Sequence, residues 1–251
     1  MNDDAIKKLF GQVPYFADQV IERFEPLTDE ASKFVVSSYW SDQGSVNLGD
    51  VCGTMHPDYA GLTWREFLTK GRRMAGNLAA FGENPSYYTD STINRQPTIY
   101  FHRLDGKTFI MEEGNHRTCI GKFYLYGRDC PYIHRVHLTE TVVDWHLLDL
   151  YNRLLAVCPN DWQVTVTSET VRREDGPGWK RDWFACDISV SVDDSEGEEE
   201  EEEWVFSREQ LTVCLAGLEY YFMKRIEEGT ATSKDAARQQ ARPGFFRRFF
   251  K

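Results

Sequence analysis

The residues from Glu112 to Thr118 have the types and the order that a phosphate-binding site needs. The segment reads Glu-Glu-Gly-Asn-His-Arg-Thr, with a β-rich run before it and helical spacing after it. A glycine between a strand and a helix lets the backbone turn sharply and lets a ligand come close. The first helical turn then presents unpaired N–H groups and the positive end of the helix dipole, which favour an anion.

The side chains of this segment suit that chemistry. Arg117 can hold two phosphate oxygens with its guanidinium fork, and His116 can act as an acid or base near neutral pH. Phosphate repels Glu112 and Glu113, so we expect one of them to hold Mg²⁺, act as a base or pair with Arg117. The expected phosphate-binding residues are Gly114, Asn115, His116, Arg117 and Thr118. The expected catalytic residues are Glu113 and His116, and the expected metal ligands are Glu112 and Glu113. A purely structural ion pair between Arg117 and one of the two glutamates is the alternative.

The neighbouring pattern predicts the elements that hold this segment. Residues 97–103 and 108–112 predict two strands joined by a tight turn at Asp105-Gly106. Residues 115–126 predict a helix that Gly127 ends as a C′ glycine. Residues 131–138 predict a further strand. The next helix is expected to begin at Thr139 or Thr141 and to end near residue 157.

The flanking regions predict additions to this core. Residues 1–83 are expected to form a helical N-terminal layer, with helical spacing over 5–24 and 29–39, a loop over 42–61, and a capping box at Thr63 that opens a helix to about residue 80. Arg72 and Arg73 on that helix could approach nucleic acid, but a solvated face is preferred. Residues 84–158 are the expected core. Residues 159–228 are expected to add a β-hairpin (162–172 and 179–192), an acidic loop (193–203) and a helix capped by Ser207. Residues 229–251 are expected to be a disordered basic-aromatic tail.

The core segment resembles the ParB/sulfiredoxin-like superfamily. The similarity rests on Gln96-Pro97 before a strand, the Asp105-Gly106 hairpin, the Gly-x-x-Arg box from Gly114 to Arg117, and the step from Gly127 to Pro131. It covers roughly residues 94–138. The resemblance implies an α/β fold, a small mixed sheet around the Gly-x-x-Arg helix. It also implies a nucleotide (ATP, ADP or CTP), with or without Mg²⁺, whose phosphate lies at the helix start.

Two departures narrow the function that the resemblance implies. Sulfiredoxins carry a reactive cysteine where this chain has Asn115, and Cys119 lies a turn later, so sulfiredoxin chemistry is disfavoured. Partition proteins of the superfamily continue into a helix-turn-helix DNA reader, which is not evident after Leu138. We therefore expect a phosphoryl-transfer or phosphodiester-cleaving enzyme, a hydrolase of the ATPase or nuclease kind. A non-catalytic module that binds a nucleotide or a partner, as a plasmid or phage effector would, is the alternative.

Composition limits the partners. The apolar and aromatic fractions, 41% and 14%, allow a substantial core. Nine acidic residues lie between Asp193 and Glu203, and removing them from the net charge of −11 leaves −2. DNA binding by bulk charge is therefore not expected, because it depends on an excess of Lys and Arg. The six cysteines are scattered without a C-x-x-C pair, which predicts free thiols. We expect a cytoplasmic protein, since no signal-like or membrane-spanning run is present.

The C-terminal segment predicts a second contact. Residues 241–251 contain pairs of Phe and Arg, and no acidic residue follows Asp235. Exposed phenylalanines are unfavourable unless something covers them. We expect this segment to dock on a protein partner or a membrane surface, or on the acidic run of the same chain, with a protein partner preferred.

Overall fold

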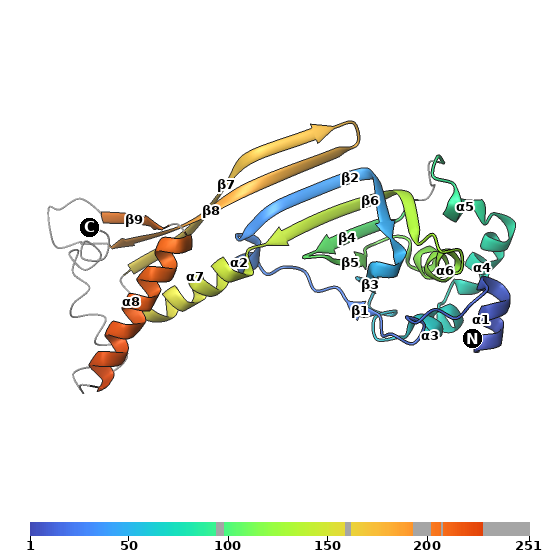
Figure 1. The fold of residues 1–251 in the computed structure, drawn as a ribbon, viewed down its shortest axis with the longest axis horizontal. Coiled ribbons are helices and arrows are strands. Elements are labelled where there is room, and N and C mark those ends of the chain that lie inside the picture. Colours follow the sequence, from blue (N-terminus) through green and yellow to red (C-terminus); the bar gives the residue numbers. More distant parts are fainter. Residues whose placement is uncertain (94–97, 159–161, 193–201, 207, 228–251) are drawn as a thin grey trace. The chain divides into compact units, whose positions relative to one another are not determined.

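The computed structural model, shown in Figure 1, describes residues 1–93, 98–158, 162–192, 202–206 and 208–227. The fold is mixed α/β, as the sequence predicted. The helices are α1 (Asp3–Phe10), α2 (Asp29–Ser32), the 3-10 turn η1 (Leu48–Asp50), α3 (Trp64–Lys70), α4 (Met74–Glu83), α5 (Ser86–Thr89), α6 (Asn115–Tyr126), α7 (Trp145–Val157) and α8 (Arg208–Glu227). No helix in these ranges combines the length and the apolar character needed to cross a bilayer.

The strands form a mixed sheet. They are β1 (Glu22–Arg23), β2 (Val35–Asn47), β3 (Val51–Thr54), β4 (Tyr100–Leu104), β5 (Lys107–Ile110), β6 (Tyr132–Val143), β7 (Trp162–Gly176), β8 (Trp179–Val192) and β9 (Glu202–Phe206). Their order is β1-β3-β5-β4-β6-β2-β8-β7, and β9 pairs with β8. The β1–β3, β3–β5 and β4–β6 pairs are parallel, whereas β4–β5, β2–β8 and β8–β9 are antiparallel.

The chain divides into two compact units made of discontinuous segments, unlike the four consecutive ranges that the sequence predicted. Unit 1 contains Met1–Leu27, Ser37–Val142 and Arg172–Trp183, and it includes every residue of the expected phosphate site. Unit 2 contains Thr28–Val36, Val143–Val171 and the chain from Phe184 onward. Within unit 2, Asp144 caps α7 by accepting from the Leu147 N–H.

The hairpin and the helix around the Gly-x-x-Arg box are confirmed. Asp105 and Gly106 have φ values of 48° and 84°, as a type I′ turn between β4 and β5 requires. Helix α6 begins directly after Gly114 and is buried along most of its length. A helix buried on all sides belongs to the core of a fold, and α6 packs against buried residues of β4, β5, β6, α1 and α3.

Lysine 122, on α6, is buried and fully hydrogen-bonded. Its Nζ donates to the backbone oxygens of Leu48, Gly49 and Val51 at 2.8, 2.8 and 2.9 Å. The same ammonium lies 4.3 Å from the ring centre of Phe16 and 5.0 Å from that of Trp64. Only 2% of the residue is exposed. Lys122 therefore ties η1 and the start of β3 to the central helix.

The N-terminal region differs from the sequence prediction. Residues 35–47 and 51–54 form β2 and β3, where a helix end and a loop were expected, because β2 pairs with β8 and β3 pairs with β5 in the sheet. Helix α1 ends at Gly11, which has a φ of 88°. The sheet is consequently larger than the small one expected, and residues 1–83 are not purely helical.

Two predicted boundaries were also wrong, and Gly127 ends α6 as predicted but in a different conformation. Strand β6 continues to Val143, so Asp144, rather than Thr139 or Thr141, caps α7. Gly127 has right-handed dihedral angles, so it is not a left-handed C′ glycine; a Cβ there would overlap the Phe10 carbonyl at the end of α1. Glu202 and Glu203 belong to β9 rather than to an acidic loop. Residues 193–201, Ser207 and the tail 229–251 lie outside the described residues.

Replacing Lys122 tests its structural role. In Lys122→Met the side chain keeps its length, but the three carbonyls lose a buried donor, and we expect a loss of about 3–5 kcal/mol in the free energy of unfolding. Urea unfolding measures this loss. The matched control is Lys70→Met, whose exposed ammonium pairs with Glu66 four residues earlier, and it should change stability by less than about 1 kcal/mol. Equal effects of the two substitutions would contradict the assignment.

The pH dependence of stability gives a second test of the same residue. Burial lowers the pKa of Lys122 to about 8, whereas a lysine of the unfolded chain has a pKa of about 10.4. Between these values the unfolded chain binds a proton that the native protein lacks, so stability from this residue rises with pH. The stability difference between wild type and Lys122→Met should grow by about 1–2 kcal/mol from about pH 8 to about pH 9.5. A flat or shrinking difference would refute the shift.

Candidate phosphate-binding site

The step from strand to helix at Gly114 has the conformation that the sequence predicted. Gly114 has a φ of 107°, and a Cβ at this position would collide with the Ile99 side chain. No side chain caps α6, and its first backbone bond runs from the Thr118 N–H to the Gly114 carbonyl at 2.7 Å. The N–H groups of Asn115 and His116 therefore precede the first intrahelical bond, at the positive end of the helix dipole.

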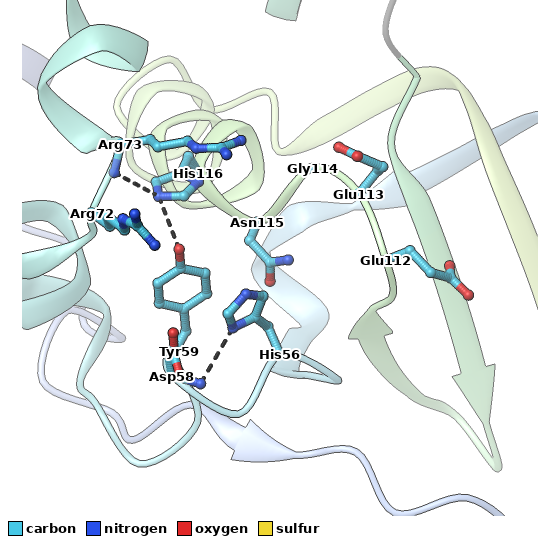
Figure 2. A pocket seen from close by; sticks show the side chains of 10 residues that line it. All are labelled: His56, Asp58, Tyr59, Arg72, Arg73, Glu112, Glu113, Gly114, Asn115 and His116. Carbon is cyan, nitrogen blue, oxygen red and sulfur yellow. Dashed lines mark hydrogen bonds between the residues drawn. The ribbon is translucent and has the colours of Figure 1, made fainter.

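A pocket of about 210 Å³ opens at this helix start, and we call it the helix-start pocket. Three segments of unit 1 line it: the loop after β3 with His56, Asp58 and Tyr59; the α3–α4 turn with Arg72 and Arg73; and the segment from Glu112 to His116. Figure 2 shows the arginines and histidines grouped around Tyr59, whereas the carboxylates of Glu112 and Glu113 lie apart from them on the β5 side. Asp58 lies beside Tyr59 on the side of the arginines, so the pocket has a mainly cationic side and an acidic side.

The loop after β3 is fixed by hydrogen bonds to α6. The Thr54 hydroxyl donates to Asn115 Oδ1 at 2.5 Å and accepts from the His56 N–H at 3.0 Å. Both Thr54 and Asn115 are buried. With its oxygen engaged, Asn115 presents its amide NH₂ to the pocket, as Figure 2 shows. Asn115 therefore links the loop to α6.

Tyr59 joins the two histidines of the pocket. Its ring stacks on His56 at 4.3 Å between centroids and on Phe67 at 4.2 Å, and it meets His116 edge-on at 5.2 Å. The Tyr59 hydroxyl lies 3.3 Å from His116 Nε2, and the Arg73 N–H donates to the same nitrogen at 3.4 Å (Figure 2). A nitrogen that accepts a backbone N–H is unprotonated, so the proton of neutral His116 is on Nδ1.

The electrostatic surroundings keep His116 neutral. Burial lowers its pKa below 6.5, and the positive charge of Arg73 is the next cause, followed by His56 and Arg117. An anion bound near these residues would offset the three charge effects. Such an anion would therefore raise the pKa of His116.

Gly71 breaks the helix that was predicted from Thr63 to about residue 80. The capping box of Thr63 and Glu66 is present as predicted, but α3 ends at Lys70 and α4 begins at Met74. A Cβ on Gly71 would press against the Phe67 ring and carbonyl. The resulting turn brings Arg72 and Arg73, both exposed, to the pocket.

Arg117 and Thr118 are placed outside the pocket lining. Arg117 Nη1 donates to the Tyr87 hydroxyl at 2.9 Å, and Nη2 donates to the Thr98 carbonyl at 3.1 Å. Nη2 also lies 3.8 Å from Glu113, and 15% of the Arg117 side chain is exposed. This is the ion pair of the structural alternative, so phosphate binding by Arg117 stays a prediction. Thr118 is fully buried, and its hydroxyl has no hydrogen-bond partner among the described residues.

The structure thus brings together Gly114, Asn115 and His116 with Glu112 and Glu113, but it adds residues that the sequence reasoning missed. His56, Asp58 and Tyr59 follow a strand that was read as a loop, and Arg72 and Arg73 were interpreted as part of a solvated helix face. The sequence signal that could have predicted the position of the two arginines is Gly71, because a glycine in the middle of a helical pattern marks a break. No group of three or more His, Cys, Asp and Glu side chains in the described ranges is arranged to hold a metal ion.

Comparison with known proteins found no match to the chain among protein-family models, curated proteins or solved structures.

The protonation of His116 can be measured directly. NMR titration of the free protein should show a pKa for His116 below 6.5, because burial and Arg73 both oppose the charged form. Arg73→Ala should raise this pKa, and saturation with inorganic phosphate or tripolyphosphate should raise it in the wild type. His116→Gln identifies the resonance. A value above 6.5 in the free protein, or no response to Arg73→Ala, would show that His116 is in a different environment.

Proposed function

We propose that the helix-start pocket binds the phosphate of a nucleotide. The observation that carries the proposal is the convergence of Arg72, Arg73 and His116 on an uncapped helix start. Backbone N–H groups, guanidinium groups and a neutral imidazole N–H together match the donors that hold phosphates in proteins. This donor set comes from segments far apart in the sequence, which favours a binding site over a local helix cap.

The charges of the lining residues decide where the phosphate lies. Two arginines and three carboxylates line the pocket, so a phosphate placed midway would gain little. Arg117 partly neutralises Glu113 from outside the pocket. The favourable position is therefore on the cationic side, near Arg73, His116 and the first N–H groups of α6.

We further propose that the bound nucleotide undergoes phosphoryl transfer or phosphodiester cleavage, as in an ATPase or nuclease. Glu113 takes the proton of a water whose oxygen attacks phosphorus, and the bond from phosphorus to the leaving oxygen breaks. Mg²⁺ is commonly held by one or two carboxylates together with phosphate oxygens, and Glu112 and Glu113 fit that role. Such an ion would turn their repulsion of the phosphate into attraction. The ParB/sulfiredoxin-like assignment and the nucleotide type (ATP, ADP or CTP) remain part of this proposal.

The contacts of Arg117 favour a second candidate, a module that binds a nucleotide or a protein partner without turnover. Its guanidinium is engaged by Tyr87 and Thr98 and lies beside Glu113, so no free arginine faces the acidic side of the pocket in the described ranges. Release of phosphate distinguishes the two candidates. Mg²⁺-dependent release of phosphate from ATP or CTP, or cleavage of DNA, supports the enzyme, whereas tight binding without release supports the module.

Removing the two arginines tests phosphate binding. We expect Arg72→Ala/Arg73→Ala to weaken the binding of ATP and of inorganic tripolyphosphate by tens-fold or more, because a hydrogen bond to a charged group contributes about 1.5–3 kcal/mol. Calorimetry with and without Mg²⁺ measures the affinities. Both side chains are exposed, so the fold should persist. Arg23→Ala, which removes an exposed arginine elsewhere in unit 1, is the control. Unchanged affinity in the double variant, or no binding by the wild type, would refute the proposal.

A further inference from the structure

A second hollow lies on the other face of the sheet from α6, and we call it the aromatic cleft. It has a volume of about 530 Å³ and is lined mainly by Trp40, Tyr100, Met111, His137 and Thr139. All of these residues belong to unit 1. They come from β2, β4 and β6 and from the end of β5, which are neighbours in the sheet (Figure 1).

The strand register explains why aromatic rings gather there. Tyr100 pairs with His137, and Phe101 pairs with Leu138. Phe101 and Leu138 are in the core with α6, so the alternation of side chains turns Tyr100 and His137 to the opposite face. The His137 ring lies 4.8 Å from Tyr100 and 5.4 Å from Trp40, between ring centroids.

The described residues leave the aromatic cleft open on one side. Trp40 is 38% exposed, although a tryptophan on a sheet is usually covered by neighbouring side chains. Its indole meets His137 edge-on, with an angle of 71° between the rings. A flat ring system can therefore be covered by Trp40 and Tyr100 without displacing the core.

The two hollows meet at Glu112 and Glu113, which line both. The Tyr100 N–H donates to the Glu113 carbonyl at 3.2 Å, so the aromatic cleft begins next to the residue that precedes Gly114. The two hollows are therefore adjacent, with the two glutamates between them.

We infer that the aromatic cleft binds the base of the nucleotide whose phosphate occupies the helix-start pocket, an inference that rests on the proposed function. Aromatic rings stack on any nucleobase. Carboxylates accept hydrogen bonds from base N–H groups and from ribose hydroxyls, but they repel phosphate. The charge pattern therefore sets one orientation, with the terminal phosphate near Arg73, the sugar and the phosphate attached to it beside the glutamates, and the base against Trp40.

Trp40→Ala and Trp40→Phe test this orientation by calorimetry with ATP, CTP, GTP, UTP and inorganic tripolyphosphate. Removing an aromatic side chain that stacks on a base weakens binding by about 5- to 150-fold. We expect Trp40→Ala to weaken the tightest-binding nucleotide to this extent, Trp40→Phe to restore much of the loss, and neither to change tripolyphosphate binding. Trp145→Ala is the matched control, because Trp145 is 48% exposed and lies in unit 2.

The outcomes separate this inference from the proposed function. If nucleotides bind no tighter than tripolyphosphate, or if Trp40→Ala leaves nucleotide affinity unchanged, the base does not lie in the aromatic cleft, although phosphate binding stands. If Trp40→Ala weakens tripolyphosphate as much as nucleotide, Trp40 acts on the fold of the site and the inference fails. If neither ligand binds to the wild type, the proposed function itself fails.

Discussion

A buried ammonium with three carbonyl partners organises unit 1. Lys122 lies near the middle of α6, and its contacts hold η1, Phe16 and Trp64 around that helix. Transferring a charge into a protein interior is unfavourable, and it is tolerated where the charge is fully hydrogen-bonded. The hydrogen bonds of the Lys122 ammonium are therefore satisfied in only one arrangement of η1 relative to α6. Since η1 connects β2 to β3, that arrangement also sets where β3 ends and where the loop with His56 and Tyr59 begins.

The sequence predicted the parts of this fold that depend on local chemistry. The Asp105-Gly106 turn, the Thr63 capping box and the break at Gly114 each rest on a few adjacent residues, and all three were found. Strands β2 and β3 were missed because their pairing with distant strands stabilises them. The stretch from Ser41 to Asn47 is mostly polar, and only its neighbours in the sheet make it a strand. Sequence spacing alone carries no information about such long-range partners.

The residues of the candidate site also divide into those that the local sequence predicts and those that tertiary packing brings to the pocket. Gly114, Asn115 and His116 could be predicted because a strand, a glycine and a helix follow one another along the chain. His56, Tyr59, Arg72 and Arg73 reach the pocket through tertiary packing, in which Tyr59 stacks on Phe67 and Gly71 interrupts a helix. Arg117 has the residue type and the spacing that predict a place in the site, but its guanidinium contacts Tyr87 and Thr98 outside the pocket lining. Residue type indicates what a side chain can bind, whereas packing decides what it meets.

Glycines without room for a side chain hold α6 at both ends and in the middle. A methyl group on Gly114 would strike Ile99, one on Gly127 would strike the end of α1, and one on Gly121 would lie 2.9 Å from Leu48 and Tyr88. These close contacts fix the position of α6 along its axis and its rotation about that axis. Any adaptation of the pocket to ligands of different size must come from the opposite wall, the exposed turn at Arg72 and Arg73. During evolution, ligand preference could then change through a few surface positions while the helix and its glycines stayed the same.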